Sequence, residues 1–210
     1  MLSEKKYKNL PLFDLDIDES EGAIVDAVAF VEAPAIERNF LAFSKDTSLQ
    51  FSVNDEMREV LGPAMVPNTP IYRHPKGGDE FYVQFSPEVI RKISQVFFKN
   101  GLTNSLNIQH SSEAADAYVF QSFITDEKTG IVAPKSLGDI PEGTWILGVK
   151  VVSDTLWNEI KQGDFNGFSV EGEFLFGKNF QSDNSPVESE VLDLMRELNK
   201  LLSSNTTLIK

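Results

Sequence analysis

The sequence predicts an α+β fold, with a β-rich core that carries a small number of helices. Three observations support this prediction. The 210 residues include 41% hydrophobic residues and sixteen phenylalanines, enough for a packed core. Several segments alternate apolar and polar residues, as half-buried strands do. Two other segments have helical spacing and begin at a serine that can cap a helix.

The first third of the chain gives weak signals. We assign residues 1–23 to an acidic N-terminal segment and residues 24–176 to the β-rich domain. Residues 27–31 resemble a strand, which Pro34 breaks. Residues 44–78 contain four prolines and a glycine pair. Such a composition indicates an irregular surface loop, with one short strand near residues 70–73.

From residue 79 onward the signals are sharper. We expect strands near residues 79–85, 103–110, 117–125, 144–152 and 165–176. Ser86 begins a helix with Pro87 in its first turn, and Asn100 and Gly101 end it. The apolar face of this helix comprises Val89, Ile90, Ile93, Val96 and Phe97. Ser153 begins a second, shorter helix, which Gly163 stops.

The C-terminal part has a different pattern. Residues 177–186 are a polar linker, residues 187–202 predict an amphipathic helix, and residues 203–210 form a tail. The apolar seam of the helix comprises Val187, Val191, Leu194, Leu198 and Leu201. This seam docks either on the chain's own domain or on a partner, for example in a homodimer or higher oligomer.

Composition excludes several function classes. A net charge of −13 disfavours binding to nucleic acid, whose phosphates need a basic surface. Without cysteine the chain has no disulfide and no thiolate zinc site. Two distant histidines have no zinc spacing, and no phosphate-binding glycine loop is present. We found no signal peptide and no membrane-spanning run. We therefore expect an intracellular protein without cofactor, metal, nucleic-acid or membrane partner.

One pair of residues could carry chemistry. His110 closes an apolar-alternating run, and Ser169 lies between Gly167 and Gly172 on the last strand. Strand alternation places His110 on the face of Leu106 and Ile108, and turns Ser169 away from the phenylalanine-rich face of its strand. A serine beside a neutral imidazole is a candidate nucleophile with its base. Backbone N–H groups near Gly167 and Gly172 could stabilise an oxyanion.

Four stretches, at residues 28–37, 82–86, 107–110 and 143–172, resemble the prohead serine proteases of tailed phages, specifically the XkdF-like branch. The resemblance implies a barrel-like core of mostly antiparallel strands with surrounding helices, as in the herpesvirus assemblins. It also implies cleavage of scaffold and major capsid protein segments inside the immature phage head, in the cytoplasm of the bacterial host. His110 matches the family's base and Ser169 its nucleophile.

The third catalytic residue stays open among four candidates, Asp126, Asp116, Glu171 and His74. Related sequences often have an acidic residue where this chain has Gln121, and loss of an orienting carboxylate slows a serine protease by orders of magnitude. An alternative hypothesis is therefore an inactive protein of protease fold that serves in capsid assembly or binds the scaffold. Activity against a scaffold protein discriminates the two hypotheses.

Overall fold

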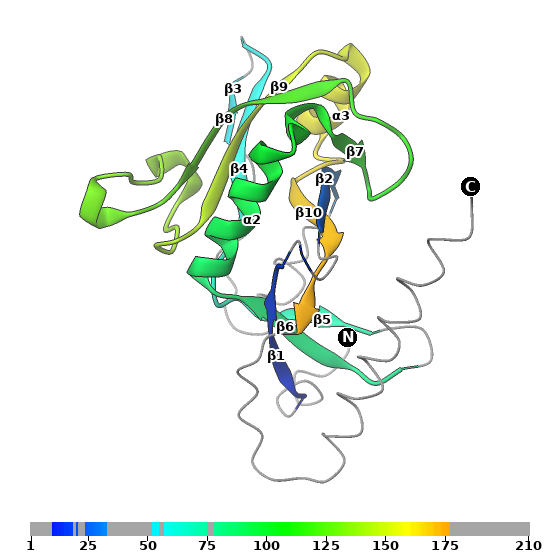
Figure 1. Ribbon diagram of the computed structural model, residues 1–210. Helices are drawn as coiled ribbons and strands as arrows, with labels where there is room; N and C mark the ends of the chain where they lie inside the picture. Colours follow the sequence, from blue (N-terminus) through cyan, green and yellow to red (C-terminus); the bar gives the residue numbers. More distant parts are fainter. Residues whose placement is uncertain are drawn as a thin grey trace, which may run out of the picture.

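The computed structural model describes residues 10–18, 20, 24–32, 52–54, 57–74 and 78–176. This part of the chain is an α+β structure of eleven strands and two α-helices, as predicted (Figure 1). In chain order the elements are β1 (Leu12–Asp16), β2 (Ile24–Val31), β3 (Ser52–Asn54), β4 (Glu59–Met65), β5 (Ile71–Arg73), β6 (Phe81–Phe85), α2 (Pro87–Lys99), η2 (Leu102–Asn104), β7 (Leu106–Ile108), β8 (Ala117–Ile124), η3 (Glu127–Thr129), η4 (Lys135–Leu137), β9 (Trp145–Val151), α3 (Asp154–Gln162), β10 (Gly167–Glu173) and β11 (Leu175–Phe176).

The described strands form three sheets, with strand orders β11-β1-β6-β5, β10-β2-β7 and β3-β4-β9-β8. Most pairs are antiparallel; β1 with β6 and β2 with β7 are parallel. Each sheet ends in two edge strands, so the described strands do not close into a barrel. The expectation of a barrel-like core is wrong in this respect, because no ladder joins one sheet to the next.

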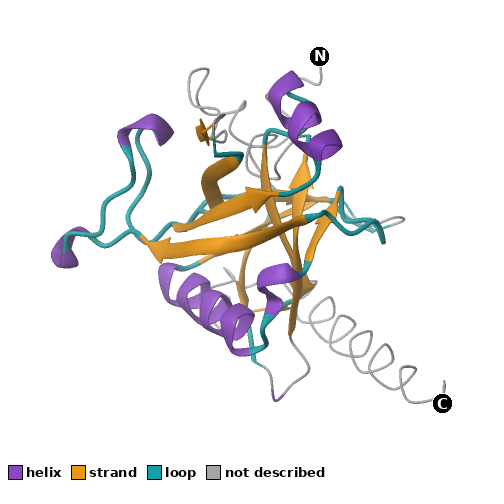
Figure 2. Ribbon diagram, turned by 90° about the horizontal axis from the view of Figure 1, so that it is seen from above, coloured by secondary structure: helices purple, strands orange, loops and turns teal. Residues whose placement is uncertain are grey.

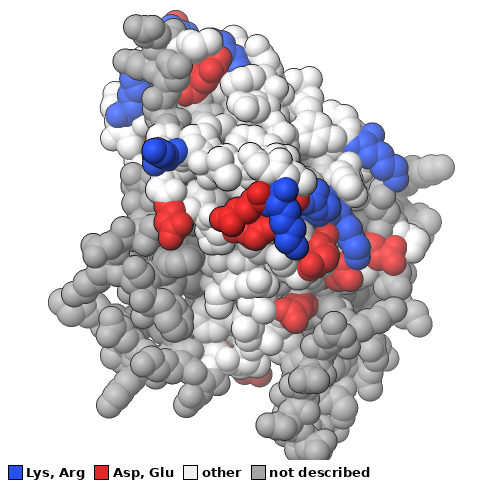
Figure 3. All heavy atoms as spheres, turned by 90° about the vertical axis from the view of Figure 1, so that its left-hand side faces the viewer, with Lys and Arg blue, Asp and Glu red and all other residues white. Residues whose placement is uncertain are grey.

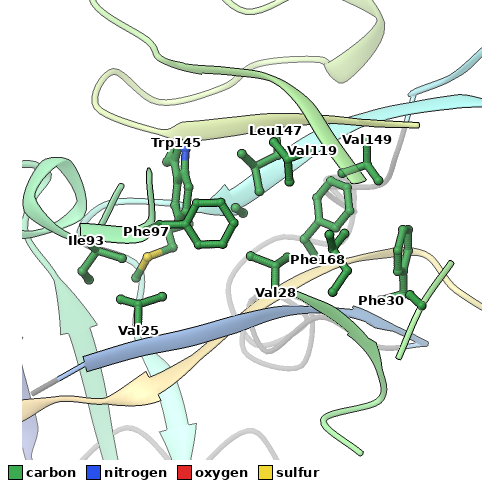
Figure 4. Close-up of a cluster of buried hydrophobic side chains, with 14 of the residues drawn as sticks. Val25, Val28, Phe30, Ile93, Phe97, Val119, Trp145, Leu147, Val149 and Phe168 are labelled. Atoms are coloured by element: carbon green, nitrogen blue, oxygen red, sulfur yellow. The ribbon is translucent and has the colours of Figure 1, made fainter. Parts of the chain in front are cut away.

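The hydrophobic core lies between the sheet β3-β4-β9-β8 and the sheet β10-β2-β7 (Figure 4). Trp145, Leu147 and Val149 reach it from β9, and α2 adds Ile93 and Phe97. Val28, Phe30 and Phe168 enter from the facing sheet, all at most 1% exposed. Each such side chain contributes about 1.5–3 kcal/mol by leaving water. Packing thus fixes the sheet that carries Ser169 against a rigid layer.

Both helices begin and end as predicted. The Ser86 hydroxyl accepts a hydrogen bond from the Val89 N–H (3.3 Å), and the Ser153 hydroxyl accepts one from the Leu156 N–H (3.2 Å). Gly163 ends α3 with φ of +85°, in the left-handed region that glycine adopts without cost.

The short strand predicted near residues 70–73 is confirmed as β5, but the prediction of an irregular loop over residues 44–78 is wrong where β3 and β4 lie. β4 pairs with β3 on one side and with β9 on the other, and Val60 is fully buried. The ladder between β4 and β9 shifts register between Pro63 and Met65. A proline lacks the N–H of a ladder, and a register shift lets a central strand accommodate it.

The folded sheets also extend into the segment that the sequence analysis assigned to an acidic N-terminal segment. Phe13 and Leu15 alternate with Asp14 and Asp16, so β1 has one apolar face and pairs with β6 and β11. The predicted linker (177–186), amphipathic helix (187–202) and tail (203–210) lie outside the described residues. Within the described ranges, no helix has the length and apolar character needed to cross a membrane.

The connection between β8 and β9 projects away from the sheets, at the left of Figure 1 and of Figure 2. It holds η3 and η4. On the face seen in Figure 3, acidic and basic side chains intermingle in a band across the middle, and most of the remaining described surface is uncharged. This face therefore has no extended region of a single charge among the described residues.

Candidate active site

Three polar residues meet at the sheet β10-β2-β7, two positions along β10 from Ser169. Ser169 and Glu171 belong to β10, Asn107 belongs to β7, and His110 follows β7. Ser169 lies opposite Ala29 of β2, and Ala29 lies opposite Asn107. Because neighbouring strands are about 4.8 Å apart, β7 and β10 are separated by almost 10 Å. Only side chains that reach across β2 can join them.

The alternation along β10 agrees with the sequence prediction. Phe168 is buried in the core with 1% exposure, while Ser169 on the other face of the strand is half-buried. The ladder shifts register between Glu171 and Gly172. A Cβ atom at Gly172 would lie 2.4 Å from the Ile24 carbonyl oxygen, so this position needs glycine for the close approach of β2. The roles of Gly167 and Gly172 at an oxyanion stay predictions.

His110 lies in a strained turn. Gln109 and His110 have φ of +52° and +56°, and the Ser111 N–H donates to the Ile108 carbonyl at 2.9 Å. A left-handed conformation costs a residue with a side chain about 1–2 kcal/mol. The turn ends strand alternation at Ile108. The prediction that His110 shares a face with Leu106 is therefore wrong, since Leu106 is buried and the His110 side chain is 40% exposed.

The turn brings His110 to Glu171. His110 Nδ1 lies 3.5 Å from Glu171 Oε2, and the Glu171 side chain is 38% exposed. Asn107 Nδ2 donates a hydrogen bond to the same oxygen at 2.7 Å. One carboxylate therefore faces both an imidazole and an amide, and an N–H on Nδ1 would leave Nε2 free to accept a proton.

Asn107 is a site residue that the sequence analysis missed. Its Oδ1 is buried and has no hydrogen-bond partner among the described residues. An unsatisfied buried acceptor costs about 1–3 kcal/mol, and such groups gather at functional sites. The sequence signal for Asn107 was its position two residues before the turn. Its contact with Glu171 could not be predicted, because it depends on how β7 and β10 each pair with β2.

The other three candidates for the third catalytic residue make different contacts. Asp126 accepts hydrogen bonds from the Lys128 and Thr129 N–H groups and caps η3 in the projecting connection. The backbone carbonyl of Asp116 accepts the N–H groups of Val152 and Ser153. The ring of His74 lies 6.4 Å from that of Tyr72 at the end of β5. Gln121 packs over Gly148 in a different sheet. Of the four candidates, Glu171 contacts His110.

Ser169 opens into a pocket between β10 and the strands β4 and β5. Its hydroxyl has no hydrogen bond to a described residue, so the pairing of Ser169 with His110 stays a prediction. Arg73 also lines this pocket, and desolvation lowers the pKa of its guanidinium, which still remains charged at neutral pH.

Residues 48–174 match the family described as "Putative phage serine protease XkdF". The chain belongs to the XkdF-like phage protease family. The match contains Asn107, His110, Ser169 and Glu171, and it begins after β2.

A curated relative gives the same assignment. The chain is 27% identical over 141 residues to the phage-like element PBSX protein XkdF of Bacillus subtilis strain 168. The aligned part covers 67% of this chain and 44% of the relative, so the chain spans less than half of that protein. No solved structure matches the chain.

Proposed function

We propose that this protein is a serine endopeptidase of phage capsid maturation, with Ser169 as nucleophile, His110 as base and Glu171 as the group that orients His110. The observation that carries the proposal is the 3.5 Å contact between His110 Nδ1 and Glu171 Oε2, formed two residues from Ser169 on the same strand. Membership of the phage protease family supports the reaction class.

The proposed reaction follows from these groups. His110 Nε2 accepts the proton of the Ser169 hydroxyl while Ser169 Oγ attacks the scissile carbonyl carbon. Glu171 accepts the hydrogen bond of Nδ1–H and stabilises the imidazolium that forms. His110 then returns the proton to the leaving amine, and water releases the acyl group by the same route. Backbone N–H groups near Gly167 and Gly172 hold the oxyanion.

The proposed substrates are segments of the phage scaffold and major capsid protein, cleaved inside the immature head within the bacterial cytoplasm. Partial exposure of His110 and Glu171 supports action on a macromolecular substrate, since both side chains can be reached from outside. A homodimer or higher oligomer through residues 187–202, and a fold relation to the herpesvirus assemblins, belong to this proposal as well.

The decisive experiment incubates the purified full chain with the scaffold and major capsid proteins of its own phage and follows cleavage by mass spectrometry. We expect Ser169→Ala to lower the cleavage rate by at least about 1,000-fold, because the nucleophile is lost. Ser136→Ala, an exposed serine of η4, is the matched control and should cleave normally. Unchanged cleavage by Ser169→Ala would refute the mechanism.

A second candidate function is an inactive protease-fold component of capsid assembly. The absence of a hydrogen bond from the Ser169 hydroxyl to any described residue favours it. If the wild-type chain binds the scaffold protein in sedimentation experiments without cleaving it, this alternative replaces the first.

A further inference from the structure

The pocket beside Ser169 has walls suited to a substrate side chain. Apart from Ser169 and its strand neighbours, the apolar walls comprise Ala64, Met65, Val66, Ile71, Phe85 and Phe174. The rings of Phe85 and Phe174 meet edge to face, with centroids 5.0 Å apart, and so form a firm boundary. The serine thus lies at the border between a polar sheet face and an apolar hollow.

The size of the pocket limits what it can hold. Its volume is about 40 Å³. At about 10–15 Å³ for each water-sized group, it holds roughly three or four heavy atoms. This matches the branched side chain of valine, leucine or isoleucine, whereas an indole ring would extend beyond it.

Arg73 is the charged residue of the pocket wall. Its guanidinium donates to the Tyr72 carbonyl at 3.1 Å and has no ion pair with any described residue. In a chain of net charge −13, a partly desolvated cation without a carboxylate partner among the described residues is unusual. An incoming carboxylate would replace the lost hydration of this guanidinium and could accept two of its N–H groups.

The strands around the pocket suit an extended peptide. β10 and β5 are edge strands of their sheets within the described residues, and both line the pocket. An extended peptide can pair with a free strand edge and direct alternate side chains into neighbouring pockets. A peptide beside β10 would carry its backbone past Ser169.

We propose that this pocket is the specificity subsite of the enzyme, and that it selects extended peptides with a valine-, leucine- or isoleucine-sized side chain next to the scissile bond and an acidic residue within two positions of it. The pocket receives the aliphatic side chain, and Arg73 binds the carboxylate. This inference rests on the proposed function and adds the substrate class to it.

Peptides built on a cleaved scaffold or capsid segment test the subsite. One series replaces the aliphatic residue by serine or tryptophan, and another replaces the acidic residue by its amide. We expect each replacement to lower kcat/KM by about tenfold or more. Equal cleavage of all the peptides would overturn the subsite while leaving the proposed function intact.

Variants of Arg73 make the test sharper. Because Arg73 is exposed in part, we expect Arg73→Gln to fold and to lose about tenfold in kcat/KM on the acidic peptide alone, with no change on the amide peptide. Arg73→Lys should retain most of the preference. Arg91→Gln, an exposed arginine of α2 outside the pocket, is the control and should change neither value. A uniform loss on both peptides would overturn the role of Arg73.

A binding measurement separates the two proposals. Fluorescence anisotropy of labelled peptides with the Ser169→Ala chain reports recognition without cleavage. If the Ser169→Ala chain binds the peptides in the expected order of preference but the wild-type chain cleaves none of them, the proposed protease function is refuted and the subsite is retained. Binding without preference in this assay would count against the subsite.

Discussion

The projecting β8–β9 connection and the face of the sheet β10-β2-β7 each carry a carboxylate that the sequence nominates for catalysis, and the two are bound in opposite ways. Asp126 accepts backbone N–H groups of the turn that follows it. Glu171 faces the side chains of Asn107, on β7, and His110, in the turn that follows β7. A carboxylate that caps a turn stabilises local backbone. A carboxylate that joins side chains from two strands can orient a reacting group instead.

The largest effect that this comparison predicts is on catalysis. Glu171→Gln keeps the shape of the side chain and removes the charge that stabilises the imidazolium. We expect kcat to fall by roughly 10⁴-fold, as loss of an orienting carboxylate does in serine proteases. Rates of cleavage of a scaffold peptide provide the measurement. A fall in kcat smaller than about tenfold would contradict the assignment of Glu171 as the third catalytic residue.

Asn107 should matter less, and mainly for activity. Asn107→Ala removes the hydrogen bond that holds Glu171, and we expect about a tenfold fall in kcat. It also removes the unpartnered Oδ1, so the free energy of unfolding should change little. Asn166→Ala is the matched control, because that amide donates to the Glu32 and Gly163 carbonyls, and its loss should lower stability without affecting kcat. Denaturant titration and rate measurements on both variants test this contrast. A loss of stability without a loss of kcat in Asn107→Ala would contradict the role of Asn107 at the site.

Asp126 should behave as the reverse of Glu171. Asp126→Ala removes a helix cap, and we expect a loss of about 1 kcal/mol in the free energy of unfolding, with unchanged kcat. Asp126→Asn retains the capping oxygen and should restore most of the stability. A large loss of activity in Asp126→Asn would contradict the division between the two regions.

The smallest effect concerns Glu88, another carboxylate that binds backbone. Its own backbone N–H and the Ser86 hydroxyl lower the pKa of this carboxyl. A lowered folded-state pKa means that the ionised form stabilises the fold above the unfolded-state pKa, and that this contribution is lost as pH falls through the folded-state pKa. We expect Glu88→Gln to lower Tm slightly at pH 7 and to match wild type near pH 3, by differential scanning calorimetry. An equal difference at both values would assign the effect to packing.

Local signals explain how much of the structure the sequence could predict. The caps at Ser86 and Ser153, the short apolar runs of β6 and β9 and the alternation in β8 and β10 predicted most elements from residue 79 onward. β4 was missed because Pro63 reads as a strand breaker, while the register shift that accommodates it depends on β9. A short-range pattern is therefore sufficient to predict an element unless pairing with a distant strand accommodates a residue that would otherwise break it.

The candidate site shows the same limit. Ser169 and His110 were selected from residue type and resemblance, but the contact with Glu171 requires a left-handed turn at Gln109 and His110. Neither position holds a glycine, the residue that usually marks a left-handed conformation in a sequence. The choice of Glu171 from four candidates also needs the register of β10 and β7 on β2, which no local pattern encodes.

The strand β2 has a consequence for selection experiments on this protein. It supplies no reacting group, yet Ala27 and Ala29 lie beneath the bridge from Asn107 to Glu171, opposite Glu171 and Ser169 respectively. A larger side chain at either alanine would occupy the space that the bridge crosses. In a library randomised along β2, survivors of a screen for cleavage should keep small residues at these two positions while Asp26, an exposed position, varies freely. Active variants with many substitutions at position 26 but only small residues at positions 27 and 29 would support the path of the bridge across β2.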